Sequence, residues 1–176
     1  AGWRLRHVED DLRKRPLAPV PPDALARMYV TEPWSDAQAE AAYAAYVASF
    51  EERPGFPGWS CARWLDWATG YASFRGDLSR VIRDGAEIVG YALAAQEPDG
   101  CHIVQMGVVP AARRRGLGRT LLRLVAAAAA TEGTREMRLA VNLDNPGARA
   151  LYASEGYCFS ARRAVYEASQ APRARH

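Results

Sequence analysis

Residues 105–124, QMGVVPAARRRGLGRTLLRL, decide the fold that we expect for this chain. An apolar, strand-like run ends at Pro110, a basic loop with two glycines follows, and a leucine-rich run with helical spacing begins at once. A helix that starts directly after such a turn presents backbone N–H groups without partners and the positive end of its dipole. Because Gly116 and Gly118 have no Cβ, the backbone there can approach a phosphate closely. The stretch therefore predicts a pocket for a phosphorylated cofactor.

The composition is typical of a folded domain. The 176 residues suit one domain with a sizeable core, and a hydrophobic share of 49% argues against disorder of the whole chain. A net charge of +3 is too small to indicate nucleic acid as a partner. No apolar run is long enough to cross a membrane, and we expect no signal peptide. Three cysteines without a CxxC motif predict reduced thiols in a cytoplasmic protein, not a metal site.

The hydrophobic pattern predicts strands and helices that alternate into a mixed sheet covered on both faces. Expected strands are 3–8, 24–30, 78–83, 87–96, 101–109 and 135–141, and residues 157–167 are expected to form a final strand or a bent hairpin pair. Helices are expected at 35–50, from Ser60 onward, at 117–132 and at 145–155. Cys101 and Cys158 are expected to be buried in their strands.

The N-terminal segment differs from the rest. A strand-like run at 3–8 is followed by the proline-rich residues 16–22, which predict an extended linker. Residues 1–22 are therefore expected to be either a loosely attached arm or an interdomain strand and linker. The main domain is expected at 23–168, and residues 169–176 are expected to form a disordered tail.

Three motifs follow one another in this order of elements. A V-x-P motif ends the central strand at Pro110, and R-x-x-G-x-G begins at Arg113. Residues 141–152, VNLDNPGARALY, are followed by Gly-Tyr at 156–157. Together these motifs resemble those of the GNAT N-acetyltransferase superfamily over about residues 24–167. A looser similarity extends to one half of the tandem GNAT proteins of the mycothiol synthase type.

The resemblance implies the GNAT fold, an α/β architecture with a central, mixed, mostly antiparallel sheet of six to seven strands. About four helices would lie on both faces, and the sheet would splay at the strand before the acyl-CoA loop. It also implies acetyl-CoA as co-substrate, no metal, and direct transfer to a primary amine in a ternary complex. That amine would belong to a small molecule, a peptide or a protein.

The same resemblance implies the residues that hold the cofactor. The loop for the CoA diphosphate would be Arg113, Arg114, Arg115, Gly116, Leu117, Gly118 and Arg119. The backbone of Met106, Gly107 and Val108 would pair with the pantetheine arm and polarise the thioester carbonyl. Asn145 and Ala148 would add contacts at the next helix start, although an N-cap role alone would also explain Asn145.

The catalytic residues are less clearly indicated. Tyr152 matches the tyrosine that the family uses to protonate the leaving thiolate, and core packing is the alternative. For the base, His102 is a candidate because a histidine has a reference pKa near 6.5, and it is expected to share its side-chain direction with Met106 and Val108. A structural role at the strand end is the alternative for His102. The next candidates for the base are two carboxylates after the first long helix, Glu51 and Glu52.

Aromatic residues are concentrated before residue 72, where the family builds the acceptor side of the site. They are expected either to wall an apolar acceptor pocket or to pack the helices on the sheet. Trp59 and Tyr46 are the candidates for substrate contact. Two other functions remain open: acetylation of an aminoacyl-tRNA, and a non-catalytic acyl-CoA-binding module. A homodimer and a tandem partner domain are the expected assemblies.

Overall fold

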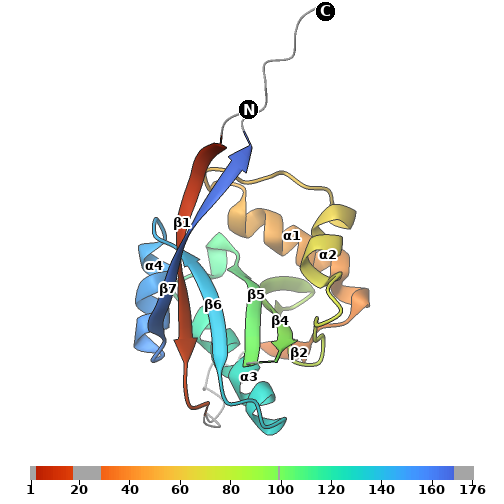
Figure 1. Ribbon diagram of the computed structural model, residues 1–176. Coiled ribbons are helices and arrows are strands. Elements are labelled where there is room, and N and C mark those ends of the chain that lie inside the picture. Colours follow the sequence, from red (N-terminus) through yellow and green to blue (C-terminus); the bar gives the residue numbers. More distant parts are fainter. Residues whose placement is uncertain (1–2, 18–28, 99, 169–176) are drawn as a thin grey trace, which may run out of the picture.

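The computed structural model describes residues 3–17, 29–98 and 100–168, which form a seven-stranded sheet and four α-helices (Figure 1). The strands are β1 (Trp3–Lys14), β2 (Val30–Pro33), β3 (Arg80–Asp84), β4 (Glu87–Glu97), β5 (Gly100–Val108), β6 (Met137–Asn142) and β7 (Cys158–Ala168). The helices are α1 (Ala39–Phe50), α2 (Cys61–Thr69), α3 (Leu117–Thr131) and α4 (Pro146–Ser154). The strand order is β2-β3-β4-β5-β6-β1-β7, antiparallel throughout except between β5 and β6. The expected mixed, mostly antiparallel sheet is confirmed.

The helices cover the two faces of the sheet and create two hydrophobic cores. Along β4, Ala92 and Ala94 pack toward α3 and α4, whereas Tyr91 and Leu93 pack toward α1 and α2. Successive side chains of a strand point to opposite faces, so a strand covered on both faces is apolar almost throughout. Figure 1 shows α4 beside the β6, β1 and β7 half of the molecule, and α1 with α2 beside the other half. We call the sheet face covered by α3 and α4 the α3/α4 face, and the face covered by α1 and α2 the α1/α2 face.

Short polar signals set the helix starts as expected. The Ser35 N–H donates to Gln38 Oε1 at 3.0 Å, although the expected helix begins with a 3-10 turn (Asp36–Gln38) before α1. Ser60 Oγ accepts from the Arg63 N–H at 3.4 Å at the start of α2. Each contact satisfies a backbone group that the first helical turn would leave unpaired.

β1 is longer and more central than the sequence indicated. It runs over Trp3–Lys14 and lies between β6 and β7. The second half of β1 is rich in charged residues, so its sequence does not indicate a strand. In the structure Glu9 pairs with Arg163 at 3.0 Å and Asp10 with Arg162 at 2.7 Å, and both arginines are on β7. Cross-strand ion pairs allow such residues in a central strand. A joint to an upstream domain remains a prediction.

Several expected segments lie wholly or mainly outside the described residues. They include most of the proline-rich run 16–22, most of the candidate strand 24–30 and the tail 169–176. Within the described chain, β2 begins at Val30.

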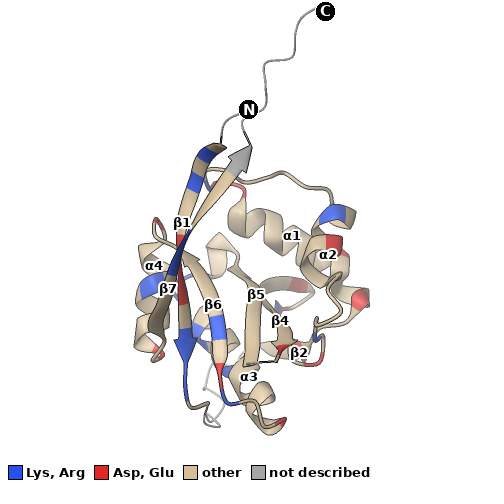
Figure 2. Ribbon diagram, viewed as in Figure 1, with Lys and Arg blue, Asp and Glu red and all other residues tan. Residues whose placement is uncertain are grey.

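The described cysteines are free, and they differ in exposure. Cys101 is buried and Cys61 is half-buried, but Cys158 is exposed. The expected burial of Cys158 was wrong because it starts β7, which pairs on one side only, at the edge of the sheet. Among the described helices, none is long and apolar enough to cross a membrane. Basic and acidic segments are interspersed along β1, β6 and β7 (Figure 2).

Candidate active site

The centre of the molecule is the place where β5 separates from β6. The parallel pairing of these strands covers only Cys101–Ile103 and Met137–Leu139, whereas β5 stays paired with β4 as far as Val108. The later residues of β6 pair with β1 alone. The expected splay at the strand before the basic loop is therefore present, and it begins after Ile103.

The splay leaves backbone groups of β5 without a neighbouring strand. The Val109 N–H donates to Val89 O at 3.0 Å, and hydrogen-bonded pairs alternate along an antiparallel ladder. The N–H groups of Val108 and Met106 therefore point away from β4, into the splay. Gly107 instead directs its backbone groups toward Tyr91 on β4.

The basic loop is shaped by two residues with positive φ. Arg114 has φ 63° and Gly116, the N-cap of α3, has φ 86°. Such angles suit glycine and are uncommon for arginine. The Thr120 N–H is bonded to Gly116 O at 3.1 Å, so the three preceding N–H groups at the start of α3 have no partner within the helix. Those donors and the helix dipole suit a phosphate.

The arginine side chains of the loop are largely engaged elsewhere. Arg113 donates from Nε to Val108 O at 3.1 Å and from Nη2 to Ser49 O at 3.0 Å. Arg119 is paired with the buried Glu155 at 2.8 Å. The backbone of the loop is therefore the stronger candidate for anion contact. Gly118 has a packing role too, because a Cβ there would lie 3.1 Å from Leu151 Cδ2 on α4.

α4 places Tyr152 close to the splay. Asn145 caps the start of α4, because its Oδ1 accepts from the Ala148 N–H at 3.2 Å. The capping explanation for Asn145 therefore holds. Tyr152 is buried at 7% exposure, with its ring centroid 5.9 Å from that of Tyr157. Burial raises the pKa of Tyr152 to about 12, since a phenolate would lose its hydration. The phenol therefore stays protonated at neutral pH.

His102 lies on the other face of the sheet from Tyr152. A β-bulge at Val104 adds one residue to β5, so the side chains before and after it no longer keep a single alternation. Ile103 packs in the core that contains Tyr152, and the adjacent His102 points the opposite way. The expectation that His102 shares its direction with Met106 and Val108 was wrong for this reason. Burial lowers the pKa of His102, which keeps the ring neutral at pH 7.

Glu51 and Glu52 are exposed just after α1, where the chain enters the loop to α2. This loop lies at the α1/α2 face, the expected acceptor side. The positive charge of Arg53 acts on Tyr152 and lowers the pKa of its phenol, against the larger effect of burial.

The aromatic residues of α1 and α2 form one packed cluster. Tyr46 is 2% exposed and stacks on Trp64 with centroids 5.1 Å apart and 16° between the planes. Helix packing thus accounts for Tyr46, and its burial speaks against direct substrate contact. Trp59 is half-buried, 5.6 Å from the Trp67 ring, and its carbonyl accepts from Tyr43 Oη at 2.7 Å. Trp59 remains a candidate for the acceptor wall.

Two polar residues at this site were missed. Gln105 Oε1 accepts from Trp64 Nε1 at 2.9 Å and from Tyr91 Oη at 2.8 Å, both from fully buried side chains. The sequence contained a signal for Gln105, because it is a polar residue in an otherwise apolar strand. Arg53 follows α1 beside a proline and has no comparable signal in the sequence.

Comparisons with known proteins agree with this geometry. The model of the acetyltransferase (GNAT) family matches residues 31–157. The chain belongs to this family. It is 32% identical over 120 residues to the mycothiol acetyltransferase of Corynebacterium efficiens, covering 68% of this chain but 40% of that protein. The chain thus spans about two fifths of the length of this curated relative.

Solved structures share the fold of this GNAT chain. A GCN5-related N-acetyltransferase from Sphaerobacter thermophilus superposes with a TM-score of 0.71 at 23% identity, over 94% of this chain and 52% of that one. The acetyltransferase AAC(6')-Iy, in complex with the bisubstrate analogue CoA-S-monomethyl-acetylneamine, gives a TM-score of 0.61 at 15% identity, over 81% and 99%. At these identities the similarity concerns the fold alone.

Proposed function

We propose that this chain is an N-acetyltransferase domain that moves an acetyl group from acetyl-CoA to a primary amine by direct attack in a ternary complex. The observation that carries the proposal is the departure of β5 from β6 after Ile103, directly before the basic loop and the start of α3. Free backbone donors and a helix N-terminus then lie along one path. Family membership and the CoA analogue bound to AAC(6')-Iy support the same cofactor.

The chain's own backbone would hold acetyl-CoA, which supplies an activated acetyl group when bound. The N–H groups of Leu117, Gly118 and Arg119 would bind the diphosphate at the start of α3. The N–H groups of Met106 and Val108 face the splay, where they would bind the pantetheine arm. A donor held there before reaction would also stabilise negative charge that develops on the acyl oxygen.

Tyr152 would protonate the departing thiolate. Its phenol is protonated at neutral pH, because burial raises its pKa to about 12, so the proton needed by the thiolate is present. Among the candidates for the base, Glu51 fits best with an amine that enters on the α1/α2 face. His102 fits less well because it faces away from Tyr152, and Glu52 remains a neighbouring alternative to Glu51.

The second candidate function, a CoA-binding module without catalysis, has one observation in its favour. The candidates for the base are either exposed, as Glu51 and Glu52 are, or turned away from Tyr152, as His102 is. A tandem partner domain would then carry the reaction, and the greater length of the curated relative is compatible with that arrangement.

One experiment separates the two functions. The chain is incubated with acetyl-CoA and a panel of primary amines that includes glucosamine, phenylalanine, spermidine and an alanyl peptide, and free CoA thiol and acetylated product are measured together. We expect product from at least one amine, and much less from Tyr152→Phe. Thermal stabilisation by CoA without product from any amine would support the binding module instead.

A further inference from the structure

The loop after α1 holds Arg53 in a defined place. The Arg53 N–H donates to Phe50 O at 2.9 Å, and the Phe56 N–H donates to Arg53 O at 3.1 Å. From β1, Arg6 Nη2 reaches across to Gly55 O at 2.8 Å. Contacts on both sides of the turn therefore fix the backbone that carries Arg53.

The Arg53 side chain lies one aromatic ring away from the splayed part of β5. Its guanidinium carbon is 4.4 Å from the centroid of the Phe50 ring. The same ring lies against Gly107, where an added Cβ would be 3.1 Å from Phe50 Cε2. Tyr91, Tyr152 and Arg113 contribute to the electrostatic surroundings of the guanidinium. Arg53 is thus on the acceptor side, next to the residues that would carry out the reaction.

This charge has no anionic partner within the described chain. Neither a hydrogen bond nor an ion pair joins the Arg53 side chain to a described carboxylate. Some arginines are matched by carboxylates, as Arg123 is by Glu155 and Arg162 by Asp10. Partial desolvation and the like charge of Arg113 both lower the pKa of Arg53, and a bound anion would offset these two effects.

Arg113 is itself a cation, and its guanidinium donates to the neutral carbonyls of Val108 and Ser49. It therefore brings no anion to Arg53. The two neighbouring cations therefore face the site with only neutral partners. A guanidinium fork that remains accessible matches the two oxygens of a carboxylate or a phosphate.

We propose that Arg53 determines acceptor specificity by binding an anionic group, a carboxylate or a phosphate, on the amine that is acetylated. The inference rests on the proposed function and adds the substrate class, an amine with an anionic group close to it. The Phe50 ring beneath the guanidinium favours an acceptor that also has an apolar part.

Matched amines test this assignment. Acetylation of phenylalanine is compared with that of phenylalaninamide, and acetylation of O-phosphoethanolamine with that of ethanolamine. We expect kcat/KM to favour the anionic member of at least one pair by about 10- to 100-fold, the range for a hydrogen bond to a charged group. The carboxylate and the phosphate arms identify the anion. Equal values in both pairs would overturn the proposal.

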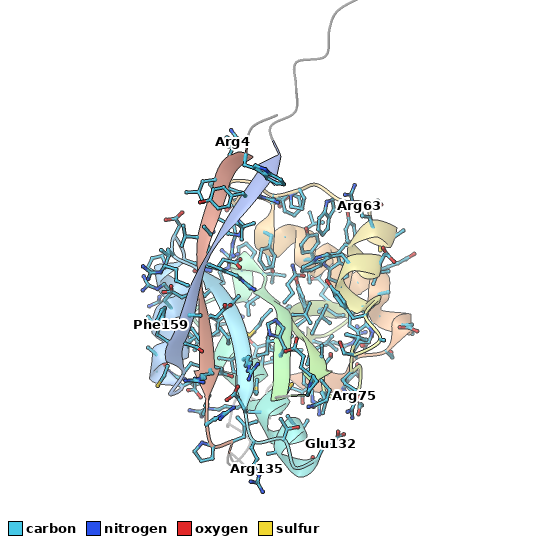
Figure 3. All side chains as sticks on the ribbon, in the orientation of Figure 1. Arg4, Arg63, Arg75, Glu132, Arg135 and Phe159 are labelled. Atoms are coloured by element: carbon cyan, nitrogen blue, oxygen red, sulfur yellow. The ribbon has the colours of Figure 1, made fainter. Side chains whose placement is uncertain are left out.

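Variants then locate the effect. Arg53→Gln should remove the preference, Arg53→Lys should keep part of it, and KM for acetyl-CoA should stay the same in both. The control is Arg63→Gln on α2 (Figure 3), which removes the same charge from another ring-stacked arginine, 5.3 Å from Trp59, and should keep the preference. A preference that survives Arg53→Gln, or a main effect on KM for acetyl-CoA, would contradict the assignment.

A binding measurement separates this inference from the proposed function. If no amine is acetylated, the proposed function fails, and the melting temperature of the CoA-saturated protein decides about Arg53. N-acetylphenylalanine and O-phospho-N-acetylethanolamine are compared with their uncharged counterparts, N-acetylphenylalaninamide and N-acetylethanolamine. At least one anionic compound should stabilise the wild type more than its counterpart, and Arg53→Gln should lose that difference. No difference in either wild-type pair would refute the inference.

Discussion

The two sides of the splay differ in what they are made of. On the α3/α4 side the groups available to a ligand are mainly backbone: N–H groups of β5 and of the α3 start, set by the positive φ of Gly116. On the α1/α2 side they are side chains, namely Arg53, Trp59 and the amide of Gln105. Backbone geometry restricts the sequence to a few residue types, whereas many side chains can wall a pocket. The α3/α4 side can therefore be recognised from a sequence motif, whereas the α1/α2 side cannot.

The largest expected effect tests the backbone side. Gly116→Val places a β-branched residue at φ 86° and should abolish thermal stabilisation by CoA. A ligand at 100 times its Kd adds about 2.7 kcal/mol of stability, and this increment should vanish. Gly133→Val is the matched control, since Gly133 has φ 81° at the other end of α3 and a Cβ there meets nothing within 4 Å. Equal CoA shifts in both variants would break the distinction.

The next effect concerns the proposed acid. Tyr152→Phe should lower kcat about 100-fold, in the range for general acid–base catalysis, with little change in the Kd of CoA. Tyr157→Phe, whose ring lies 5.9 Å away, should have a smaller effect on kcat. Because the pKa of Tyr152 is raised to about 12, the acid form persists through the alkaline range, and its loss should not limit the rate below about pH 11. Unchanged turnover in Tyr152→Phe would remove this residue from the mechanism.

The side chains on the α1/α2 side are tested through the stability of the protein. Gln105→Leu leaves Trp64 Nε1 and Tyr91 Oη without an acceptor in a fully buried place, which should lower the free energy of unfolding by about 2–4 kcal/mol. Gln105→Glu keeps an oxygen for both donors and should lose less. Urea unfolding measures both variants. A loss in Gln105→Leu below that in Gln105→Glu would show that this contact does not hold the acceptor side together.

The smallest effect compares native thiols. Cys101 is buried in the part of β5 that stays paired with β6, and burial raises the pKa of its thiol to about 12, so little thiolate forms. Iodoacetamide at pH 8 should modify the exposed Cys158 and leave Cys101 intact until denaturant is added, which mass spectrometry of peptides resolves. Fast labelling of Cys101 in the native protein would mean that the closed end of the splay opens readily.

Much of the fold could be predicted because its signals are local. Ser60 and Asn145 cap the helices that they were expected to cap, and the Asp84-Gly85 turn joins β3 to β4. The failures have non-local causes. The second half of β1 is charged and becomes a central strand only through partners on β7, about 150 residues away in the chain.

The candidate site shows the same division. The bulge at Val104 follows from pairing between β4 and β5, and it turns His102 away from the side expected for it. No residue type near position 104 announces such a bulge. Only the fold indicates a role for Arg53. It places Phe50, on which the guanidinium stacks, against Gly107, and it gives the guanidinium no described carboxylate as a partner.

The sequence by itself determined the family, the splayed sheet and the basic loop that opens α3. It did so because Pro110, Gly116 and Asn145 answer to backbone rules that act over a few residues. Only the tertiary structure decided which face His102 occupies, that Tyr46 is buried in the aromatic cluster, and that Arg53 stands beside the splay without an anion. Those outcomes depend on register and on contacts between distant segments, and no local pattern in the chain encodes them.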